Sequence, residues 1–297
     1  MRNFAGVAIF LAIGLVAGAA GAPDKPCNLI RYVSLPVTLD PASRPMVPLM
    51  IDGQVENLLV DTGGVFSELG EGVVAKLNLP PKPMDFYLEG FGGRIDNQYV
   101  TVPAMQIAGQ TVKDRPFVVT SDDSLPLGVD GILGPDILAV FDVDFDFAAG
   151  KITLFSPDHC EGKVVYWSSG NYAMIPFRLD DWRHVLVNTT LDGKNVRATI
   201  DTGSYRSVMS LEFAADLFDL DKAELKKETG RHPFKTLAFE GVTVNSPDIM
   251  LVPDRESRIM GGYGEPKLIL GMGVLRQLHL YIAYKERNLY ITAAGAH

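Results

Sequence analysis

The tripeptide Asp-Thr-Gly occurs twice in this chain, as Asp61-Thr62-Gly63 and as Asp201-Thr202-Gly203. The two copies lie 140 positions apart (201 minus 61), and each closes a short apolar run. Two carboxylates brought to one point cannot both ionise cheaply, so they share a proton. Such a pair can take a proton from a water molecule and donate another to a carbonyl oxygen, which is the chemistry of peptide-bond hydrolysis. The duplicated aspartates are therefore candidates for a catalytic pair.

The residues that precede the two copies align without a gap. Ile51-Asp52-Gly53 falls over Leu191-Asp192-Gly193, and Leu58-Leu59-Val60 falls over Ala198-Thr199-Ile200. Asp-Gly between alternating apolar residues is a strong signal for a tight hairpin turn. Each half therefore predicts a strand, a tight turn and a second strand that ends in Asp-Thr-Gly, followed by a helical segment.

A second match lies further along each half. Ile132-Leu133-Gly134 falls over Ile269-Leu270-Gly271 at an offset of 137 (269 minus 132). Beyond it, apolar residues alternate with a period of two in both halves, as strands with one buried face require. The economical explanation is two homologous, mostly β halves of about 130 residues each, which is an ordinary size for a domain.

With both elements present in both halves, the chain resembles the aspartic proteases of the retropepsin and pepsin type. Those enzymes pair an apolar-apolar-Asp-Thr-Gly strand with a later apolar-apolar-Gly segment in each lobe. The resemblance runs from about Val33 to Thr292 and is to the bacterial, exported, single-chain form. It implies an all-β fold of two homologous β-barrel lobes with short helices and an active-site cleft between them. The expected lobes are 23–158 and 172–297, with a polar connector at 159–171.

The resemblance also implies a role for each residue of the two triplets. Asp61 and Asp201 would be the catalytic dyad. The residues after them would support the site, the threonines by bonding across to the opposite loop and the glycines by letting backbone pass close to the carboxylates. These supporting residues are Thr62, Gly63, Thr202 and Gly203.

The fourth position differs between the halves, with Gly64 in the first and Ser204 in the second. In pepsin-like enzymes a serine hydroxyl at this place can bond the outer carboxylate oxygen, and Gly64 can supply no such bond. A hydrogen bond to the ionised form lowers the pKa of a carboxylate. We therefore expect Asp201 to be the more readily ionised member and Asp61 to hold the shared proton.

This chemistry requires neither a metal nor an organic cofactor. The five histidines show no zinc-ligand spacing, and there is no Gly-x-Ser-x-Gly motif. The net charge of −9 argues against nucleic acid as a partner. The expected partner is a peptide or protein substrate, and the chain is expected to act as a monomer because it supplies both lobes itself.

The first half is longer than the second in the region where this family carries a flap over the substrate. Asp61 to the turn at Gly109 spans 48 positions, and Asp201 to Gly241 spans 40. Apolar strand residues leading into a glycine-rich tip suit a hairpin that bends over a peptide. We predict a flap over about 84–100, the alternative being an ordinary surface hairpin. The candidate substrate-covering residues are Tyr87, Gly90, Phe91, Gly92 and Gly93.

The second half has its own extra residues around 260–266, in a glycine-rich stretch. This loop either borders the cleft or is simply mobile, and the sequence leaves both readings open.

The N-terminal residues 1–22 resemble a secretory signal peptide, with Arg2 ahead of a long uncharged stretch. This predicts a periplasmic or secreted protein, and the alternative is an uncleaved membrane anchor. The only two cysteines, Cys27 and Cys160, fit an oxidising compartment. A bridge between them would tie the N-terminal segment to the connector, and the alternative is two free thiols.

The sequence as a whole predicts an exported aspartic-type endopeptidase, a hydrolase that cleaves between largely apolar residues as the resemblance implies. One alternative is a catalytically silent, two-lobed peptide- or protein-binding module of the same fold. The intact Asp61 and Asp201 argue against it, because a protein without activity has no chemical reason to keep both. A third reading is a processing enzyme with the same chemistry that is fixed to the membrane by its N-terminus.

Overall fold

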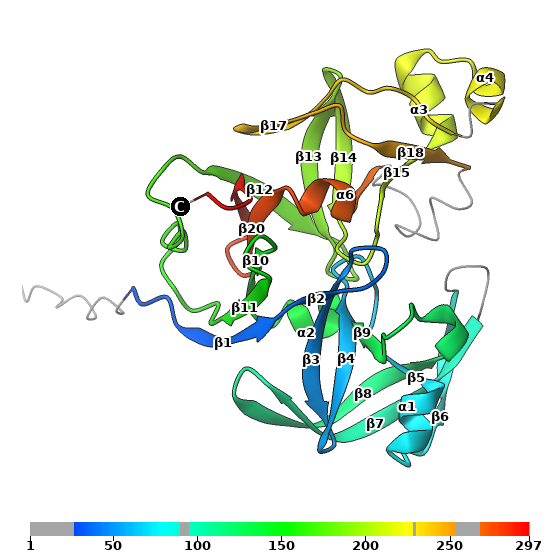
Figure 1. Cartoon of the computed structure of the whole chain (residues 1–297), viewed down its shortest axis with the longest axis vertical. Coiled ribbons are helices and arrows are strands. Elements are labelled where there is room, and N and C mark those ends of the chain that lie inside the picture. The colour runs from blue at the N-terminus through cyan, green and yellow to red at the C-terminus, as the bar shows by residue number, and fades with distance from the viewer. Residues whose placement is uncertain (1–26, 90–94, 228–229, 254–267, 297) are drawn as a thin grey trace, which may run out of the picture.

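The computed structural model describes residues 27–89, 95–227, 230–253 and 268–296, which form two lobes joined by a central sheet (Figure 1). The predicted signal peptide, the flap residues Gly90, Phe91, Gly92 and Gly93, and the loop at 260–266 lie outside the described residues. No helix within the described ranges is both long enough and apolar enough to cross a membrane.

The first lobe is a β-barrel. Its strands follow one another in the order β2-β3-β4-β9-β5-β8-β7-β6, and the ring closes because β3 also pairs with β7, with Met50 opposite Gln106. Its strands are β2 (Thr38–Leu39), β3 (Pro45–Ile51), β4 (Gln54–Val60), β5 (Glu68–Gly70), β6 (Lys82–Glu89), β7 (Ile95–Ile107), β8 (Gln110–Thr120) and β9 (Gly131–Leu133). Its helices are α1 (Glu71–Lys76), the short 3₁₀ turn η2 (Asp122–Ser124) and α2 (Pro135–Leu138).

The second lobe repeats much of this arrangement in a more open form. Its path is β13-β14-β19-β15-β18, and β16 joins β13 to β17, so the pairs among the described residues do not complete a ring. Its strands are β13 (Val185–Leu191), β14 (Lys194–Ile200), β15 (Ser207–Ser210), β16 (Thr236–Phe239), β17 (Val242–Asn245), β18 (Ile249–Val252) and β19 (Leu268–Leu270). Its helices are α3 (Leu211–Phe218), α4 (Lys222–Lys227) and α6 (Met272–Leu275).

The central sheet takes strands from both halves. The two halves meet where β10 pairs with β20, with Val143 opposite Ile282. The disulfide Cys27–Cys160, with a Cα–Cα distance of 5.1 Å, ties the start of the described chain to the segment between β11 and β12 of this sheet. In order, its strands are β1 (Arg31–Pro36), β11 (Lys151–Phe155), β10 (Asp142–Asp146), β20 (Leu278–Ala283), β21 (Asn288–Ala293) and β12 (Ala173–Leu179).

The two predicted hairpin turns form for the expected reason. Asp52 and Gly53 have φ of 45° and 82°, and Asp192 and Gly193 have φ of 45° and 77°. Two successive residues at positive φ make the turn whose twist matches that of the flanking strands, and Asp-Gly is a preferred sequence for it. The turns therefore fix the register of β3 with β4 and of β13 with β14, and so fix where Asp-Thr-Gly follows each second strand.

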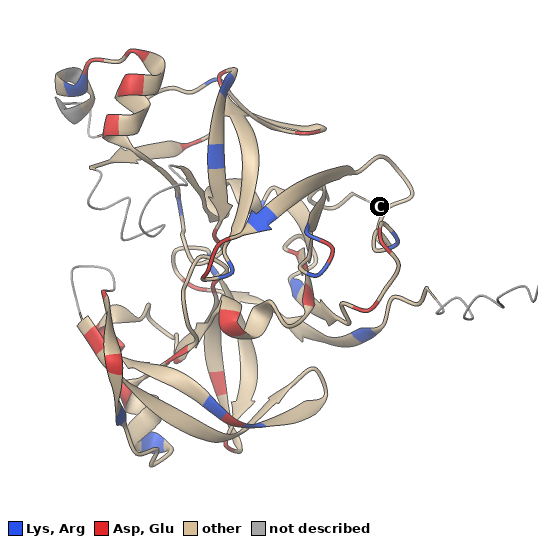
Figure 2. Ribbon diagram, turned by 180° about the vertical axis from the view of Figure 1, so that it is seen from behind, with Lys and Arg blue, Asp and Glu red and all other residues tan. Residues whose placement is uncertain are grey.

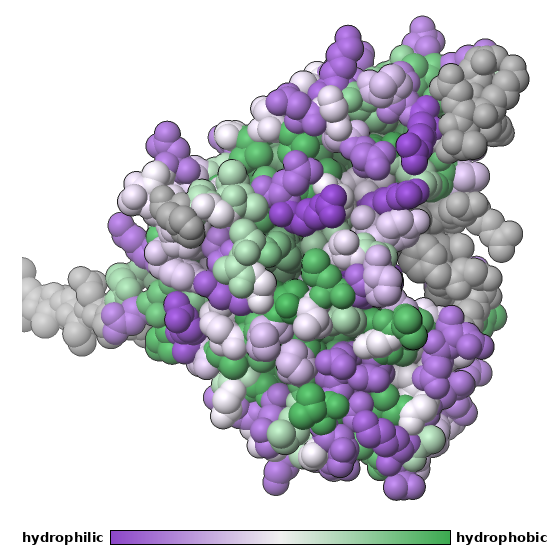
Figure 3. All heavy atoms as spheres, in the orientation of Figure 1, coloured by the Kyte–Doolittle hydropathy of each residue, from purple (hydrophilic) through white to green (hydrophobic). Residues whose placement is uncertain are grey.

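One apolar core runs through both lobes and the central sheet. In the space-filling view hydrophilic side chains dominate the outer ends of the lobes, and hydrophobic ones show between them (Figure 3). Acidic and basic residues are spread over both lobes rather than gathered in one patch (Figure 2). The excess of acidic residues behind the net charge of −9 therefore marks no single docking face.

A buried polar network lies on one face of the central sheet. The His159 ring contacts Asp142 with an Nε2–Oδ2 distance of 2.5 Å, and the His279 ring contacts Asp144 at 2.6 Å. Tyr166 donates its hydroxyl hydrogen to Asp144. Burial raises the pKa of Asp142 to about 6, although the His159 ring favours its ionised form. These groups pair with one another because a buried carboxylate without a partner is costly.

Candidate active site

The two aspartates arrive at the junction of the lobes in the same way. Asp61 follows β4 and its N–H donates to the Leu133 carbonyl at 3.0 Å, while Asp201 follows β14 and its N–H donates to the Leu270 carbonyl at 3.0 Å. The acceptors belong to β9 and β19, which run parallel to β4 and β14. The apolar-apolar-Gly segments seen in the sequence are therefore the strands that hold each aspartate in place.

The threonines bond the two loops to each other. The Thr62 N–H donates to Thr202 Oγ1 at 3.1 Å, and the Thr202 N–H donates to Thr62 Oγ1 at 3.1 Å. Each hydroxyl then donates into the opposite strand, Thr62 to the Ile200 carbonyl at 2.7 Å and Thr202 to the Val60 carbonyl at 2.6 Å. Both threonines are fully buried. Because every bond has its mirror image, the two loops are fixed with matching geometry.

Each carboxylate packs against the glycine of the other loop. A Cβ added to Gly63 would lie 2.2 Å from Cγ of Asp201, and a Cβ added to Gly203 would lie 2.3 Å from Cγ of Asp61. Such distances are far inside van der Waals contact, so any side chain at either glycine would displace a carboxylate. The two aspartates therefore meet across the junction with backbone directly against them.

Backbone N–H groups hold one oxygen of each carboxylate. Asp61 Oδ1 accepts from the N–H groups of Gly63 and Gly64, both at 2.8 Å. Asp201 Oδ1 accepts from the N–H groups of Gly203 and Ser204, both at 2.9 Å. The second oxygen of each carboxylate receives none of these backbone bonds. The arrangement thus leaves one oxygen of each group for a reacting molecule.

The hydrogen bond on which the predicted proton assignment rested is not made in the structure. Asp201 is buried, and its burial together with the adjacent Asp61 carboxylate raises the pKa of Asp201 well above its ordinary value. Asp61 is only half-buried. The Ser204 hydroxyl donates to the Arg206 carbonyl at 2.8 Å, so the bond expected to favour ionised Asp201 is not made. Burial therefore favours the neutral form of Asp201, which is the opposite of the predicted asymmetry.

Comparison with known proteins agrees with this geometry. The family model for aspartyl proteases matches residues 47–137, which contain the first Asp-Thr-Gly and β9. An aspartic proteinase from Irpex lacteus superposes with a TM-score of 0.56 and 16% identity, covering 89% of this chain and 97% of that one. Basic 7S globulin from soybean superposes with a TM-score of 0.54 and 11% identity, covering 91% and 96%. A search of curated proteins gave no significant match.

This chain has an aspartic protease fold. The superpositions extend over both lobes, so the likeness is not confined to the half that the family model matches. Within the described residues no three His, Cys, Asp or Glu side chains are grouped as metal ligands would be.

The predicted flap region of this aspartic protease fold is a β-hairpin. β6 pairs antiparallel with β7, with Glu89 opposite Ile95, and its tip lies outside the described residues. Among the predicted flap residues, Tyr87 is 66% exposed. Its neighbour Phe86 contacts Phe66 instead, with ring centroids 5.9 Å apart, and Phe66 follows the loop that carries Asp61. Strand alternation thus places Phe86, which the sequence did not single out, on the other face of β6 from Tyr87 and against Phe66.

An aromatic residue of the second half completes this cluster. Trp182, in the turn between β12 and β13, meets the Phe66 ring edge-on with centroids 5.7 Å apart. Trp182 and Phe86 are both about half exposed, at 48% and 49%. Phe66, Phe86 and Trp182, which we call the aromatic cluster, therefore present apolar surface from both lobes.

Sequence reasoning missed two serines that support the loops. Ser67 Oγ accepts from the Gly134 N–H at 3.0 Å and donates to Asp136 at 2.7 Å, while Ser207 Oγ accepts from the Gly271 N–H at 3.2 Å. Both serines are fully buried. They are separated by the same 140 positions as the bonded Thr62 and Thr202, so the alignment that found the triplets could have found them.

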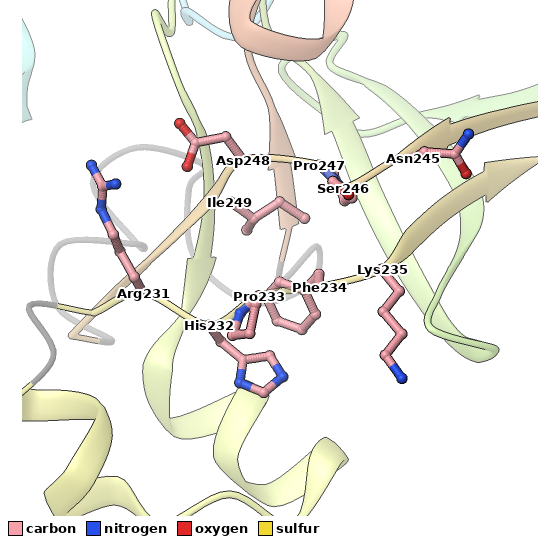
Figure 4. A pocket seen from close by; sticks show the side chains of 10 residues that line it. All are labelled: Arg231, His232, Pro233, Phe234, Lys235, Asn245, Ser246, Pro247, Asp248 and Ile249. Atoms are coloured by element: carbon pink, nitrogen blue, oxygen red, sulfur yellow. The ribbon is translucent and has the colours of Figure 1, made fainter.

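An open pocket of about 620 Å³ lies elsewhere in the second lobe (Figure 4). It is lined by two segments, 231–235 and 245–249, from the strands around β16 to β18. Neither Asp61 nor Asp201 lines this pocket, and no residue of the aromatic cluster does. The pocket is therefore separate from the candidate catalytic pair.

Proposed function

We propose that this protein is an exported aspartic endopeptidase that hydrolyses peptide bonds with a water molecule activated between Asp61 and Asp201. The observation that carries the proposal is the reciprocal packing of each carboxylate on the opposite glycine, 2.2 Å and 2.3 Å from a notional Cβ. Together with the mirrored threonine bonds, it brings two carboxylates to one point. That proximity is the requirement for sharing one proton.

The chemical steps follow from the asymmetry of the pair. Ionised Asp61 takes a proton from the water while the water oxygen attacks the amide carbon. Protonated Asp201 donates its proton to the carbonyl oxygen. The tetrahedral intermediate then collapses. The proton held by Asp61 passes to the leaving nitrogen, the C–N bond breaks, and the hydroxyl proton returns to Asp201. Every proton is accounted for, and the pair ends as it began.

The aromatic cluster supports a peptide substrate with apolar side chains. Phe66, Phe86 and Trp182 leave apolar surface exposed next to the first catalytic loop. Burying such surface under a substrate side chain is favourable by about 25 cal/mol per Å². A chain that supplies both aspartates needs no second copy, so we propose that it acts as a monomer.

Export is supported by the disulfide between Cys27 and Cys160, because such bonds persist in oxidising compartments. We propose a periplasmic or secreted location. Sequencing the N-terminus of the mature protein tests it, since a chain that begins after residue 20 is cleaved, whereas one that retains residues 1–22 is anchored.

The decisive experiment is cleavage of a peptide library by the wild-type protein and by Asp61→Asn and Asp201→Asn. The proposal expects wild-type cleavage with a bell-shaped pH profile and a loss of at least about 10³-fold in both variants. Cleavage that survives either substitution would refute the dyad. If the wild type binds peptides but cleaves none between about pH 3 and about pH 8, the silent binding module is the better reading.

A further inference from the structure

The same five-residue turn occurs once in each half, just before the strand that leads into the catalytic hairpin. The first runs from Asp40 to Arg44, between β2 and β3, and the second from Asp180 to His184, between β12 and β13. Their residues correspond at the same 140-position offset as Thr62 and Thr202.

The aspartate that opens each turn bonds the same two backbone positions. Asp40 Oδ1 accepts from the N–H groups two and four residues later, at 2.9 and 2.8 Å. Asp180 Oδ1 accepts from the equivalent N–H groups at 3.0 and 2.9 Å. The fourth residue is left-handed in both turns, with φ of 65° at Ser43 and 68° at Arg183. The two turns are therefore one structure used twice.

The last side chain of each turn crosses to the catalytic loop of the other half. Arg44 is held by Asp40 at 2.7 and 2.8 Å, and its Nη1 donates to the Gly203 carbonyl at 3.3 Å. His184 is held by Asp180, with Nδ1 and Oδ2 2.8 Å apart, and its Nε2 lies 2.9 Å from the Gly64 carbonyl. The two contacts correspond at the 140-position offset, except that the acceptor is displaced by one residue along the loop.

Both nitrogens of the His184 ring face acceptor oxygens. A ring that donates at both positions is the imidazolium form, which carries the same two functions as the Arg44 guanidinium, a bond to its own aspartate and a bond to the opposite loop. The Asp180 carboxylate lies at Nδ1, and the Asp61 carboxylate accepts from the N–H of Gly64, the residue that the ring contacts. His184 as a whole is 2% exposed.

His184 contacts Gly64, and Gly64 also bonds Asp61. Gly64 donates its N–H to Asp61 Oδ1 at 2.8 Å, and its carbonyl accepts from His184. Gly64 has no side chain to anchor it, whereas Ser204 at the matching place bonds the Arg206 carbonyl. The first loop thus depends on a contact from the other lobe to fix the residue whose N–H orients Asp61.

We infer that His184, held by Asp180, is a positioning residue for the dyad, which does for the first catalytic loop what Arg44 does for the second. The inference rests on the proposed function, because it explains how Asp61 is kept in its reactive orientation. It identifies a contribution of the second lobe to the catalytic loop of the first.

The test compares wild type with His184→Phe, which keeps a ring without donors, and with His184→Arg, which copies the first half. His232→Phe is the matched control, because His232 lies in the second lobe away from both loops. We expect His184→Phe to lower kcat by at least about tenfold with KM within about threefold, since misplacement of a catalytic group affects the chemical step most. His184→Arg should recover most of that loss, and His232→Phe should cleave as wild type.

An unchanged kcat in His184→Phe, or an Arg variant as slow as the Phe variant, would overturn the inference. A second measurement does not need turnover. The His159 ring also faces two acceptor oxygens, Asp142 Oδ2 and the Cys160 carbonyl, so the spectra of wild type and His184→Phe are compared. Nitrogen-15 NMR near pH 5 should show, in wild type and not in His184→Phe, two ring N–H protons of one histidine slowed in exchange by bonding. Their absence sinks the inference even in an active enzyme. Their presence in a protein that cleaves no peptide leaves the contact standing and refutes the proposed function instead.

Discussion

The first and second halves of the chain offer the dyad the same backbone and different surroundings. Thr62 and Thr202 make mirrored bonds, and Gly63 and Gly203 meet opposite carboxylates at almost the same distance. Outside this inner layer, the position of Arg44 is taken by His184. The first half also follows its helix α1 with the hairpin strand β6, where the second half has α4.

The proposed chemistry needs the Asp-Thr-Gly loop in both halves, but it needs the surrounding features in only one half. Two carboxylates can share a proton only if each loop passes directly against the other, so neither half can change its inner layer alone. Under the proposed function, a hairpin that covers the substrate and a cluster of aromatic rings are needed in one half only. The outer layer was therefore free to diverge between the halves.

The largest expected effect comes from adding one methyl group to the inner layer. Gly63→Ala would place Cβ 2.2 Å from Cγ of Asp201, and Gly203→Ala would place it 2.3 Å from Cγ of Asp61. Each should lower kcat/KM by at least about 10³-fold, because the carboxylate it meets must move. Peptide hydrolysis measures this. Gly170→Ala is the control, since its Cβ would meet only Ser168 Oγ, at 3.6 Å. Unequal losses in Gly63→Ala and Gly203→Ala would show that the two loops do not hold their carboxylates equivalently.

The sequence predicted this inner layer because its residues are tied to their positions by contacts that allow no substitute. A triplet, a hairpin turn and an apolar-apolar-Gly strand each recur at a fixed offset, and the parallel pairs β4–β9 and β14–β19 are what those recurrences encode. The same offset also relates Asp40 to Asp180. The repeats in the sequence did not point to that pair because the side chains that finish the two turns, Arg44 and His184, differ in residue type.

The central sheet offers a second contrast between the halves. Asp142 on β10 corresponds to His279 on β20 at the 137-position offset, so one half supplies a carboxylate where the other supplies an imidazole. Burial raises the pKa of Asp142 from 3.8 to about 6. A group whose folded pKa is raised contributes most to stability below its unfolded pKa, and that contribution is lost as pH rises through the folded value.

The free energy of unfolding of wild type relative to Asp142→Asn should therefore fall between about pH 4 and about pH 6, by up to about 3 kcal/mol. The asparagine variant keeps a neutral side chain throughout, so the pH dependence of groups that do not contact Asp142 cancels in the difference, and His159 is the contacting group whose pH dependence does not. Denaturant unfolding at several pH values measures it. A difference that rises with pH over this window would show that Asp142 is better stabilised as the carboxylate than its burial indicates.

The threonine pair tests whether the inner layer is energetically as well as geometrically symmetric. Thr62→Val and Thr202→Val each remove a buried hydroxyl that accepts one bond and donates another. Each should cost about 2 kcal/mol of unfolding free energy, because a backbone N–H and a carbonyl are left buried without partners. Thr199→Val is the control, since the buried Thr199 hydroxyl has no hydrogen-bond partner within the described residues. It should be neutral or stabilising.

The two threonine losses should agree within about 0.5 kcal/mol, and the double variant should cost less than their sum because the bonds are shared. Fully additive losses would mean that the loops are held independently. Thermal or denaturant unfolding of the four proteins decides between these outcomes.

The site features that the sequence could not predict depend on where a short side chain turns and on how deeply a group is buried. Ser204 was expected to bond the dyad, but its hydroxyl has a nearer acceptor in the Arg206 carbonyl, two residues along. Asp201 is more buried than Asp61, and no pattern in the chain encodes that difference. Both outcomes depend on packing in three dimensions, which a one-dimensional offset does not contain.

The smallest expected effect comes from removing the hydroxyl of Ser204, which has no counterpart at Gly64. Ser204→Ala removes the hydroxyl but keeps the backbone N–H that donates to Asp201 Oδ1 at 2.9 Å. The acidic limb of the pH–rate profile should therefore shift by less than about 0.3 unit, because no bond to the ionised carboxylate is lost. Stability should fall by about 1 kcal/mol from the lost bond to the Arg206 carbonyl. A shift of the acidic limb by about one unit would instead mean that the hydroxyl turns to Asp201 during catalysis, and the difference between Gly64 and Ser204 would then belong to the chemistry rather than to the support of the loop.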